Sequence, residues 1–480
     1  MRFRAGAILA RIQSLGTWGQ DKVLRRVLGN SSAMFASYAI SAVLTIMTAR
    51  LLGLADFGLL GIVITFVSAV NRLLSFRMAD LVVRYMGEYV TRKEMDRGAA
   101  LVKAAALTEG ITSIIAFVVL VLIAPLGALF FGKDTTSAPL FIFYGISILA
   151  NITTETATGV LQVTNHYRSQ ATINLIQSIL VALLIVGSYL VHGGLFAILA
   201  AYLIGKIILG LGPIVVAYYH LNHLFGKGWW RAPFSLLPPF RELTHFALTT
   251  NFFGTINLVS RDSEQLWIRL FFGLNYVAYY KVAQAIINMV VLPITPFVST
   301  SYPEINRAIV TRQWRHLHDL LKRVTLIASV WTGAVAAGIL LFGRPVLFQT
   351  WVIFGHTVSL MGKDFSPFKP SYLPAYPALL VLLVGYGIAS ILFWNRSLLL
   401  ALGQPGFPMK VNFWTALAKV ILTVLIVPVY GYVAEAAILS SYFVVSISLM
   451  VWRGLSVLKQ RELEPSPPDV NSPQCLRVSG

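Results

Sequence analysis

The sequence has almost no cysteine: Cys475, near the C-terminus, is the only one in 480 residues. A single thiol excludes internal disulfides, cysteine metal centres and thiol catalysis. The chain also lacks the G-x-x-x-x-G-K-[ST] phosphate loop, which excludes ATP hydrolysis by that mechanism. Neither H-E-x-x-H nor Cys/His ligand spacing occurs, so the sequence predicts no metal site. A membrane glycosyltransferase or polymerase would need a catalytic group in an outer loop, and Asp364 and Arg344 are thin support for that, so we predict that the protein is not an enzyme.

Charge is scarce as well. Charged residues make up 12% of the chain against 57% hydrophobic residues, and the mean hydropathy is +0.74. Such a composition is typical of a multi-spanning membrane protein. Acidic residues are half as numerous as basic ones, with 19 Asp and Glu against 38 Lys and Arg. The basic residues concentrate in loops on one side, so the positive-inside rule explains the excess without a nucleic-acid partner.

The apolar runs predict an all-α protein with twelve membrane spans, and an even number puts both termini on the cytoplasmic side. The expected spans are 27–49, 57–77, 101–124, 138–163, 170–191, 194–219, 244–271, 275–299, 322–342, 376–402, 411–429 and 431–452. The expected domains are a basic N-terminal segment (1–26), a six-helix lobe (27–221), a linker (222–243), a second six-helix lobe (244–455) and a tail (456–480).

The two halves repeat one another. LLGLADFGLLGIVITFVSAV from Leu51 matches LFFGLNYVAYYKVAQAIINMV from Leu270, pairing Gly53 with Gly273. Because each half has six spans, the repeat predicts two lobes with the same orientation, related by an axis along the membrane normal.

Four charges interrupt the apolar stretch from Ala247 to Phe272: Arg261, Asp262, Glu264 and Arg269. On a helical wheel they fall on one half together with Asn257 and several other polar residues. Each charge at mid-bilayer costs about 2.5–3.5 kcal/mol on insertion scales, so the stripe needs partners, water or a ligand. We interpret the stretch as one continuous helix facing a polar cavity. The alternative is a span that ends at Ser260 and an exposed loop.

Other spans carry polar stripes that point to the same water-filled cavity between the lobes. Their members are Lys281, Gln284 and Asn288 in the eighth span, Asn151, Glu155, Thr158 and Gln162 in the fourth, Arg396 in the tenth and Lys419 in the eleventh. Simpler interpretations exist for single residues. Arg261 and Glu264 could neutralise each other at i,i+3 spacing, Lys206 is interpreted as structural, and Glu435 is expected to be solvated near an outer end.

The first two spans, ARLLGLADFGLLGIVITFVSAVNRLLSFRMADLVVRYMGEY, and their echo IRLFFGLNYVAYYKVAQ resemble the polysaccharide transporter (O-antigen flippase-like) family. That family belongs to the multidrug/oligosaccharidyl-lipid/polysaccharide exporter superfamily. Gly53, Phe57 and Gly58 fit its L-G-x-x-x-[FY]-G motif. In the second copy Ala278 replaces the last glycine, and the loop 344–376 is longer than the family's usual connection.

The resemblance implies two six-helix lobes around a central cavity. It implies a flippase that moves lipid-linked oligosaccharide or polysaccharide precursors, such as those of lipopolysaccharide, across the bacterial inner membrane by alternating access. No cofactor is implied beyond a coupling ion, H⁺ or Na⁺. The implied partners are the lipid-linked glycan, the bilayer, a glycan polymerase and glycosyltransferases.

The resemblance also assigns roles within the cavity. Bases and amides would bind the pyrophosphate or acidic sugars: Arg261, Arg269, Lys281, Arg396, Lys419, Asn257, Gln284 and Asn288. Carboxylates would carry the coupling ion: Asp262, Glu264 and Glu155. The alternatives are a cation-coupled multidrug exporter of the same superfamily, a sugar or organic-anion symporter, and a membrane polymerase or ligase.

Overall fold

The computed structural model describes residues 22–463 except 238, 350–351, 354–355, 358, 361–362 and 365. Most of the expected N-terminal segment, most of the tail and part of the loop 344–376 therefore lie outside the described residues. Long apolar runs rich in Leu, Ile, Val and Ala form helices, because a helix satisfies all its backbone hydrogen bonds internally.

The described residues of the N-terminal half form seven α-helices and three short 3₁₀ turns. They are α2 (Lys22–Leu74), α3 (Ala79–Thr91), α4 (Met95–Phe131), η2 (Thr135–Ser137), α5 (Ala138–Ala150), α6 (Thr154–Val163), α7 (Tyr167–Leu190), α8 (Leu195–Phe225), η3 (Trp229–Arg231) and η4 (Phe234–Leu236).

The C-terminal half begins with a helix in three parts. They are α9 (Phe240–Asn257), the π-helix η5 (Leu258–Asp262) and α10 (Glu264–Phe271). The elements that follow are α11 (Leu274–Val291), η6 (Leu292–Ile294), α12 (Thr295–Val310), α13 (Trp314–Phe348), η7 (Pro370–Tyr372), α14 (Ala375–Ile391), α15 (Asn395–Ala401), α16 (Gly406–Tyr430) and α17 (Tyr432–Leu463). Between α13 and η7, β1 (Val352–Ile353) pairs antiparallel with β2 (His356–Thr357), and β3 (Ser359–Leu360) with β4 (Lys363–Asp364).

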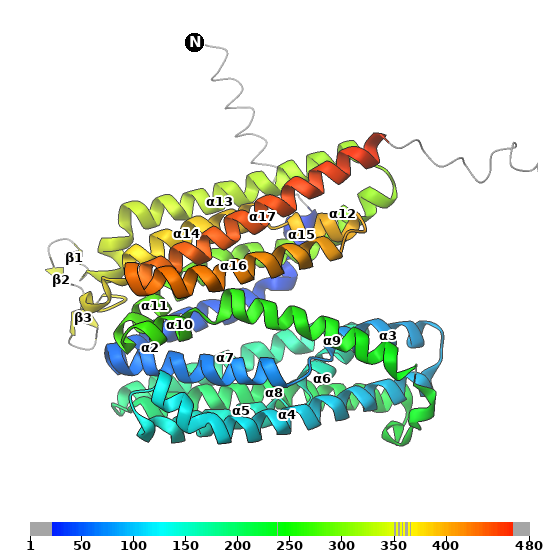
Figure 1. Cartoon of the computed structure of the whole chain (residues 1–480), viewed down its shortest axis with the longest axis horizontal. Coiled ribbons are helices and arrows are strands. Elements are labelled where there is room, and N and C mark those ends of the chain that lie inside the picture. Colours follow the sequence, from blue (N-terminus) through cyan, green and yellow to red (C-terminus); the bar gives the residue numbers. More distant parts are fainter. Residues whose placement is uncertain are drawn as a thin grey trace, which may run out of the picture.

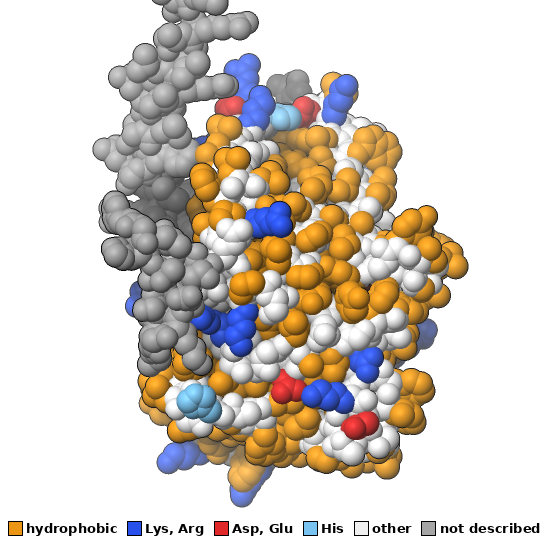
Figure 2. Space-filling model, turned by 90° about the vertical axis from the view of Figure 1, so that its left-hand side faces the viewer, with side chains coloured by type: hydrophobic (Ala, Val, Ile, Leu, Met, Phe, Trp, Pro, Cys, Tyr) orange, Lys and Arg blue, Asp and Glu red, His pale blue; other side chains and the backbone are white. Residues whose placement is uncertain are grey.

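Most helices run along the long axis of the molecule, in two stacked groups (Figure 1). The strands lie at one end, which we call the strand end, while α3 and the last turn of α17 lie at the other, the α3 end. Apolar side chains cover the outer faces of the helices; Leu122, Val215, Leu341 and Leu425 are all at least 65% exposed. Viewed from the strand end, apolar side chains also dominate, with scattered basic and few acidic ones (Figure 2). The outer faces of the helices therefore suit lipid rather than water.

Ten helical stretches among the described residues are long and apolar enough to cross a membrane. Twelve spans were predicted. The first and second predicted spans are both parts of α2, and the seventh, α9 to α10, is the charged stretch. The polypeptide is a multi-pass membrane protein.

The helix α2 bends sharply at Gly53, whose φ of 74° and ψ of −178° lie outside the helical region. Only glycine adopts such a backbone conformation readily. The bend separates the two predicted spans, so the chain runs to the strand end along the first arm and returns along the second (Figure 1). Tyr372 holds the bend from outside, donating a 2.9 Å hydrogen bond to the carbonyl of Ala49.

Equivalent turns in the two halves share their geometry. Lys93 (φ 61°) and Arg312 (φ 53°) precede α4 and α13, and the next residue in each turn donates to the carbonyl five residues earlier (Glu94 to Tyr89, 2.9 Å; Gln313 to Ala308, 2.8 Å). Asn165 and Gly403 form a second such pair at positive φ. The internal repeat seen in the sequence therefore extends to backbone hydrogen bonds.

Four predicted spans are broken, which corrects the expectation of continuous helices. The fourth is interrupted between Ala150 and Thr154, the seventh at the π-helix and Ser263, the eighth at the 3₁₀ turn η6, and the tenth between Ile391 and Asn395. The fourth and tenth spans are equivalent under the repeat. In membrane proteins, non-helical backbone at this depth occurs where it is buried in protein or lines a cavity.

Candidate functional site

The break in the seventh span distributes its charges to different surroundings. The π-helix carries Arg261 and Asp262 to a cavity, whereas Glu264, at the start of α10, is 1% exposed. Inserted π turns are rare and often occur at functional sites. The continuous charged stripe expected from the wheel is therefore divided at Ser263.

A polar cavity of about 900 Å³ lies within the C-terminal half, among the described residues. It brings together three predicted ligand residues, Asn257, Arg261 and Arg396, with the predicted carboxylate Asp262. Tyr302, Tyr386, Asn395, Asn412 and Phe443 complete much of the lining. The cavity offers both polar contacts and apolar surface.

Arg261 lines this cavity and has a hydrogen-bond donor that the described residues leave unused. Its guanidinium carbon lies 4.9 Å from the centre of the Phe443 ring, within the range of a cation–π contact. Its Nε is buried and has no hydrogen-bond partner among the described residues. A buried donor without an acceptor is costly, so a bound anion would stabilise it.

A second cavity, of about 460 Å³, lies between the first arm of α2 and α11. Its lining includes the predicted residues Lys281, Gln284 and Asn288, and also Gln265. The Lys281 Nζ lies 4.3 Å from the centre of the Phe57 ring, and Gln265 donates to Gln284 at 3.0 Å. The stripe on the eighth span thus faces a cavity, as its spacing suggested.

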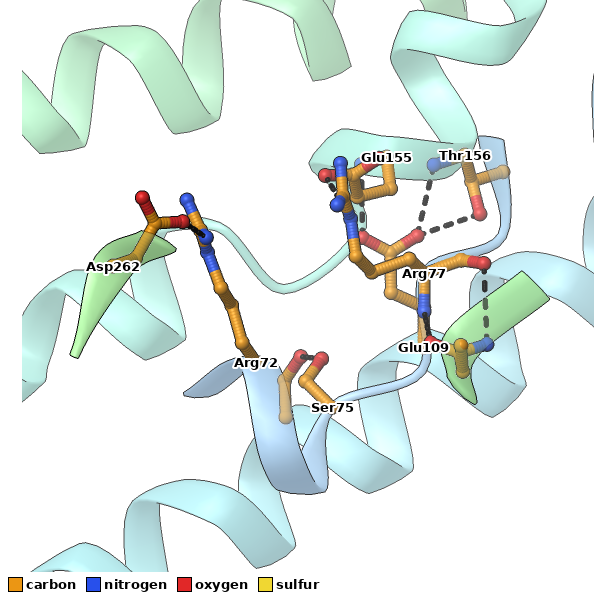
Figure 3. A network of polar contacts seen from close by, with 9 residues as sticks. Arg72, Ser75, Arg77, Glu109, Glu155, Thr156 and Asp262 are labelled. Carbon is orange, nitrogen blue, oxygen red and sulfur yellow. Dashed lines mark hydrogen bonds and ion pairs between the residues drawn. The ribbon is translucent and has the colours of Figure 1, made fainter. Parts of the chain in front are cut away.

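A third cavity, of about 230 Å³, lies in the N-terminal half and contains Glu155. Glu155 forms a 3.0 Å ion pair with Arg77, whose backbone N–H donates to Asn251 of α9 at 2.7 Å. Arg72, on the same wall, forms an ion pair with Asp262 (Figure 3). These contacts connect the second arm of α2 to the broken helix across the two halves.

At the α3 end the halves are also joined by Tyr85, which donates to the Glu242 carboxylate of α9 at 2.8 Å. Burial, and then this hydrogen bond, raise the pKa of Tyr85. The hydroxyl therefore remains a donor at neutral pH.

The sequence did not single out several residues of the third cavity. Arg72 and Arg77 lie at the end of the second predicted span and were assigned no role, and Lys206 was interpreted as structural, yet all three line the cavity. Glu109 is 1% exposed and accepts hydrogen bonds from the backbone N–H groups of Glu155 and Thr156, both at 2.9 Å (Figure 3). Its signal was available: a lone carboxylate inside the apolar run of α4.

Three predicted site residues line none of these three cavities. Glu264 and Lys419 form a fully buried ion pair of 2.7 Å. Arg269 donates to the carbonyls of Phe131 (3.0 Å), Phe272 (3.1 Å) and Gly132, and so fastens α10 to the end of α4. The expectation that Glu435 is solvated was wrong: it is 0% exposed and lies 3.2 Å from Lys419.

Comparison with known proteins places this geometry in context. Residues 23–308 match the family model described as polysaccharide biosynthesis protein. The fold resembles the lipid II flippase MurJ in an inward closed conformation (TM-score 0.68, 14% identity, 91% of this chain and 90% of that one). It also resembles an inward-facing multidrug resistance MATE family transporter of the MOP superfamily (0.63, 14%, 90% and 96%).

A third solved structure with this fold is a MOP superfamily transporter from Pyrococcus furiosus, whose title states that the reverse polarity of its binding pocket suggests a different function (0.60, 14%, 92% and 96%). Comparison with curated proteins gives no significant match. At these identities the solved structures establish the fold alone.

Proposed function

Because this chain belongs to the polysaccharide biosynthesis protein family, we propose that it translocates a lipid-linked oligosaccharide or polysaccharide precursor across the bacterial inner membrane by alternating access. Transport is coupled to an H⁺ or Na⁺ gradient. The observation that carries the proposal is Arg261, whose buried Nε has no hydrogen-bond partner among the described residues and which lines a cavity of about 900 Å³. Lipid-linked precursors carry phosphate groups, which arginine binds through charge-assisted hydrogen bonds.

The proposed architecture completes twelve spans. The first arm of α2 and the broken helix from α9 to α10 are two spans in addition to the ten apolar stretches. The twelve spans form two six-helix lobes, 27–221 and 244–455. The α3 end faces the cytoplasm, and both termini lie on that side. The glycan polymerase and glycosyltransferases of the same assembly are the expected protein partners.

Alternating access requires that contacts at the strand end break and reform. Arg269 with the end of α4 and Arg50 with the carbonyl of Ser366 (2.7 Å) join the two lobes there. In the proposed cycle these contacts close the outer side while the precursor binds from the α3 end.

The test replaces two of the cations that line the cavities. In a strain whose surface glycan depends on this protein, Arg261→Ala and Lys281→Ala should each lower glycan export at least tenfold, because a hydrogen bond to a charged group is worth about 1.5–3 kcal/mol. The matched control is Lys410→Ala, at an exposed position. Membrane levels are measured by immunoblot, and export by quantifying surface glycan.

Normal surface glycan in both cavity variants would overturn the proposal. Drug accumulation measured in the same strains separates it from multidrug export: the proposal expects no change in accumulation. A rise in drug accumulation with intact glycan would assign the protein to drug export.

A further inference from the structure

Behind the broken helix lies a buried cluster of ionisable side chains from three elements: Glu264 of α10, Lys419 of α16 and Glu435 of α17. The three side chains are at most 1% exposed. The Lys419 Nζ lies 2.7 Å from Glu264 Oε1, 3.2 Å from Glu435 Oε1 and 3.1 Å from the carbonyl oxygen of Ser260. Thr423 donates to the other Glu435 oxygen at 2.9 Å. We call these three residues the buried triad.

The charges of the triad do not balance. Two carboxylates face one ammonium group, so the fully ionised triad carries a net charge of −1. Among the described residues, no other cation lies within ion-pair distance of either carboxylate. An uncompensated charge sealed from water costs several kcal/mol.

The neighbouring elements do not supply the missing positive charge. Tyr280 of α11 is 0% exposed, and its hydroxyl has no hydrogen-bond partner among the described residues. Neither Tyr280 nor Tyr386 of α14 can carry a positive charge. On the π-helix, Asp262 is held by Arg72, and Arg261 lies at the large cavity. Glu435 Oε1 is also without an aligned hydrogen-bond donor. The hydroxyl oxygen of Tyr280 and Oε1 of Glu435 are therefore both buried with hydrogen-bonding capacity that the described residues do not use.

A proton resolves the imbalance better than a metal ion. The ammonium group of Lys419 already occupies the position between the two carboxylates. The described residues contain no group of three or more His, Cys, Asp or Glu that could hold a metal. A proton on one carboxylate leaves a neutral glutamic acid beside an ion pair, and the net charge is zero.

We infer that Glu264, Lys419 and Glu435 form a proton-binding site that controls the π-helix. One proton is shared by the two carboxylates; its release to water on one side of the membrane converts a carboxylic acid to a carboxylate, and no other bond changes. The Lys419 ammonium group then interacts with two charged carboxylates, and its hydrogen bond to the carbonyl of Ser260 becomes weaker. Because Arg261 and Asp262 follow Ser260 directly, deprotonation moves the residues that face the cavity. This control of substrate binding rests on the proposed function; the proton site itself does not.

Infrared spectroscopy of the purified full-length protein tests the site. A protonated glutamic acid gives a C=O stretching band distinct from that of carboxylate, and the band should persist well above pH 4.3, where exposed glutamate ionises. Glu264→Gln and Glu435→Gln should each remove a band equivalent to one carboxyl group, because the remaining glutamate is then neutralised by Lys419. A Glu109→Gln variant identifies any band from that other buried carboxylate.

Lys419→Met gives an independent measurement with the opposite sign. Without the ammonium, both glutamates should be protonated, so the triad band should double. A band that survives either glutamine substitution, or one that does not grow in Lys419→Met, would overturn the inference.

Transport in liposomes tests the link to function, with a fluorescent polyisoprenyl pyrophosphate-linked monosaccharide as the probe. A pH gradient should accelerate transport by the natural protein several-fold, and Glu435→Gln should retain the basal rate and lose the acceleration. An unchanged acceleration in Glu435→Gln would reject control by the triad. If the natural protein moves no probe, the proposed function fails while the infrared result still decides the proton site.

Discussion

Lys419 shows how far burial changes the role of one residue. The sequence predicts a cavity cation, whereas its ammonium lies between Glu264 and Glu435 with a side-chain exposure of 1%. Removing one member of a buried ion cluster leaves the others uncompensated, which is far more costly than losing a surface pair.

We therefore expect Lys419→Ala to lower the free energy of unfolding by about 3–5 kcal/mol, because the ionised carboxylate of the buried triad loses its counter-ion. Lys410→Ala, on the same helix at an exposed position, should change it by less than about 0.5 kcal/mol. Denaturant unfolding of both variants in the same detergent measures the difference. Equal stability of the two variants would show that the triad contributes no net stabilisation.

The sequence could predict that a residue faces a cavity only where the apolar run around it makes its charge stand out. Charges within apolar runs revealed Arg261, Lys281 and Glu155, all of which line cavities. The ion-pair partners of Asp262 and Glu264 were not predictable, because Arg72 lies 190 positions from Asp262 and Lys419 lies 155 positions from Glu264. Such pairings depend on how helices pack, which local spacing does not encode.

At the scale of elements, α2 and α11 approach so closely that only glycine fits between them. A Cβ added at Gly58 would lie 2.1 Å from the backbone carbonyl oxygen of Leu274. Backbone cannot yield as a flexible side chain can, so the two helices would have to separate.

Gly58→Ala should therefore destabilise the protein by about 1–3 kcal/mol. Gly87→Ala in α3 is the matched control, because nothing lies within 4 Å of its added Cβ. Alanine at that helical position should be neutral or stabilise by up to about 1 kcal/mol. Thermal unfolding of the two variants measures the contrast, and a Gly58→Ala melting temperature at or above the natural value would contradict the close contact.

Element positions were largely predictable, because a run of apolar residues long enough to span is a local property. Breaks within spans were not. The helix α6 begins at Thr154 because the Glu109 carboxylate accepts from its first backbone N–H groups, and that acceptor is 46 positions away in the chain. The π-helix likewise depends on Lys419 of α16, whose ammonium group donates a hydrogen bond to the carbonyl of Ser260.

At the scale of the whole molecule, few polar contacts join the second arm of α2 to the broken helix. The ion pair of Arg72 with Asp262 is one, and its side chains are 41% and 46% exposed. Pairs this exposed contribute about 0–1 kcal/mol, which is enough to bias two conformers and too little to fix one.

Arg72→Ala should accordingly shift the conformers by up to about fivefold toward exposure of the cavity at the α3 end. The measurement is the rate at which a membrane-impermeant maleimide labels Asn412→Cys, in a Cys475→Ser background. Asp262→Ala should add nothing to Arg72→Ala if the two act as a pair. Arg92→Ala, whose partner Glu88 lies on α3 beside it, is the control and should leave the rate unchanged; a rate unchanged in Arg72→Ala as well would argue against a role for the pair.

The matched turns at Lys93 and Arg312, and at Asn165 and Gly403, have a consequence for the origin of the chain. Backbone details of this kind are inherited together when a gene is doubled, and a shorter ancestor with one copy would have assembled as a homodimer of identical subunits. Fusion freed each copy to change alone. The first now presents Arg72, Arg77 and Lys206 to its cavity, while the second encloses its lysine between two glutamates. Common descent thus explains why the two halves share their backbone turns, and independent substitutions after the fusion explain why their charged side chains differ.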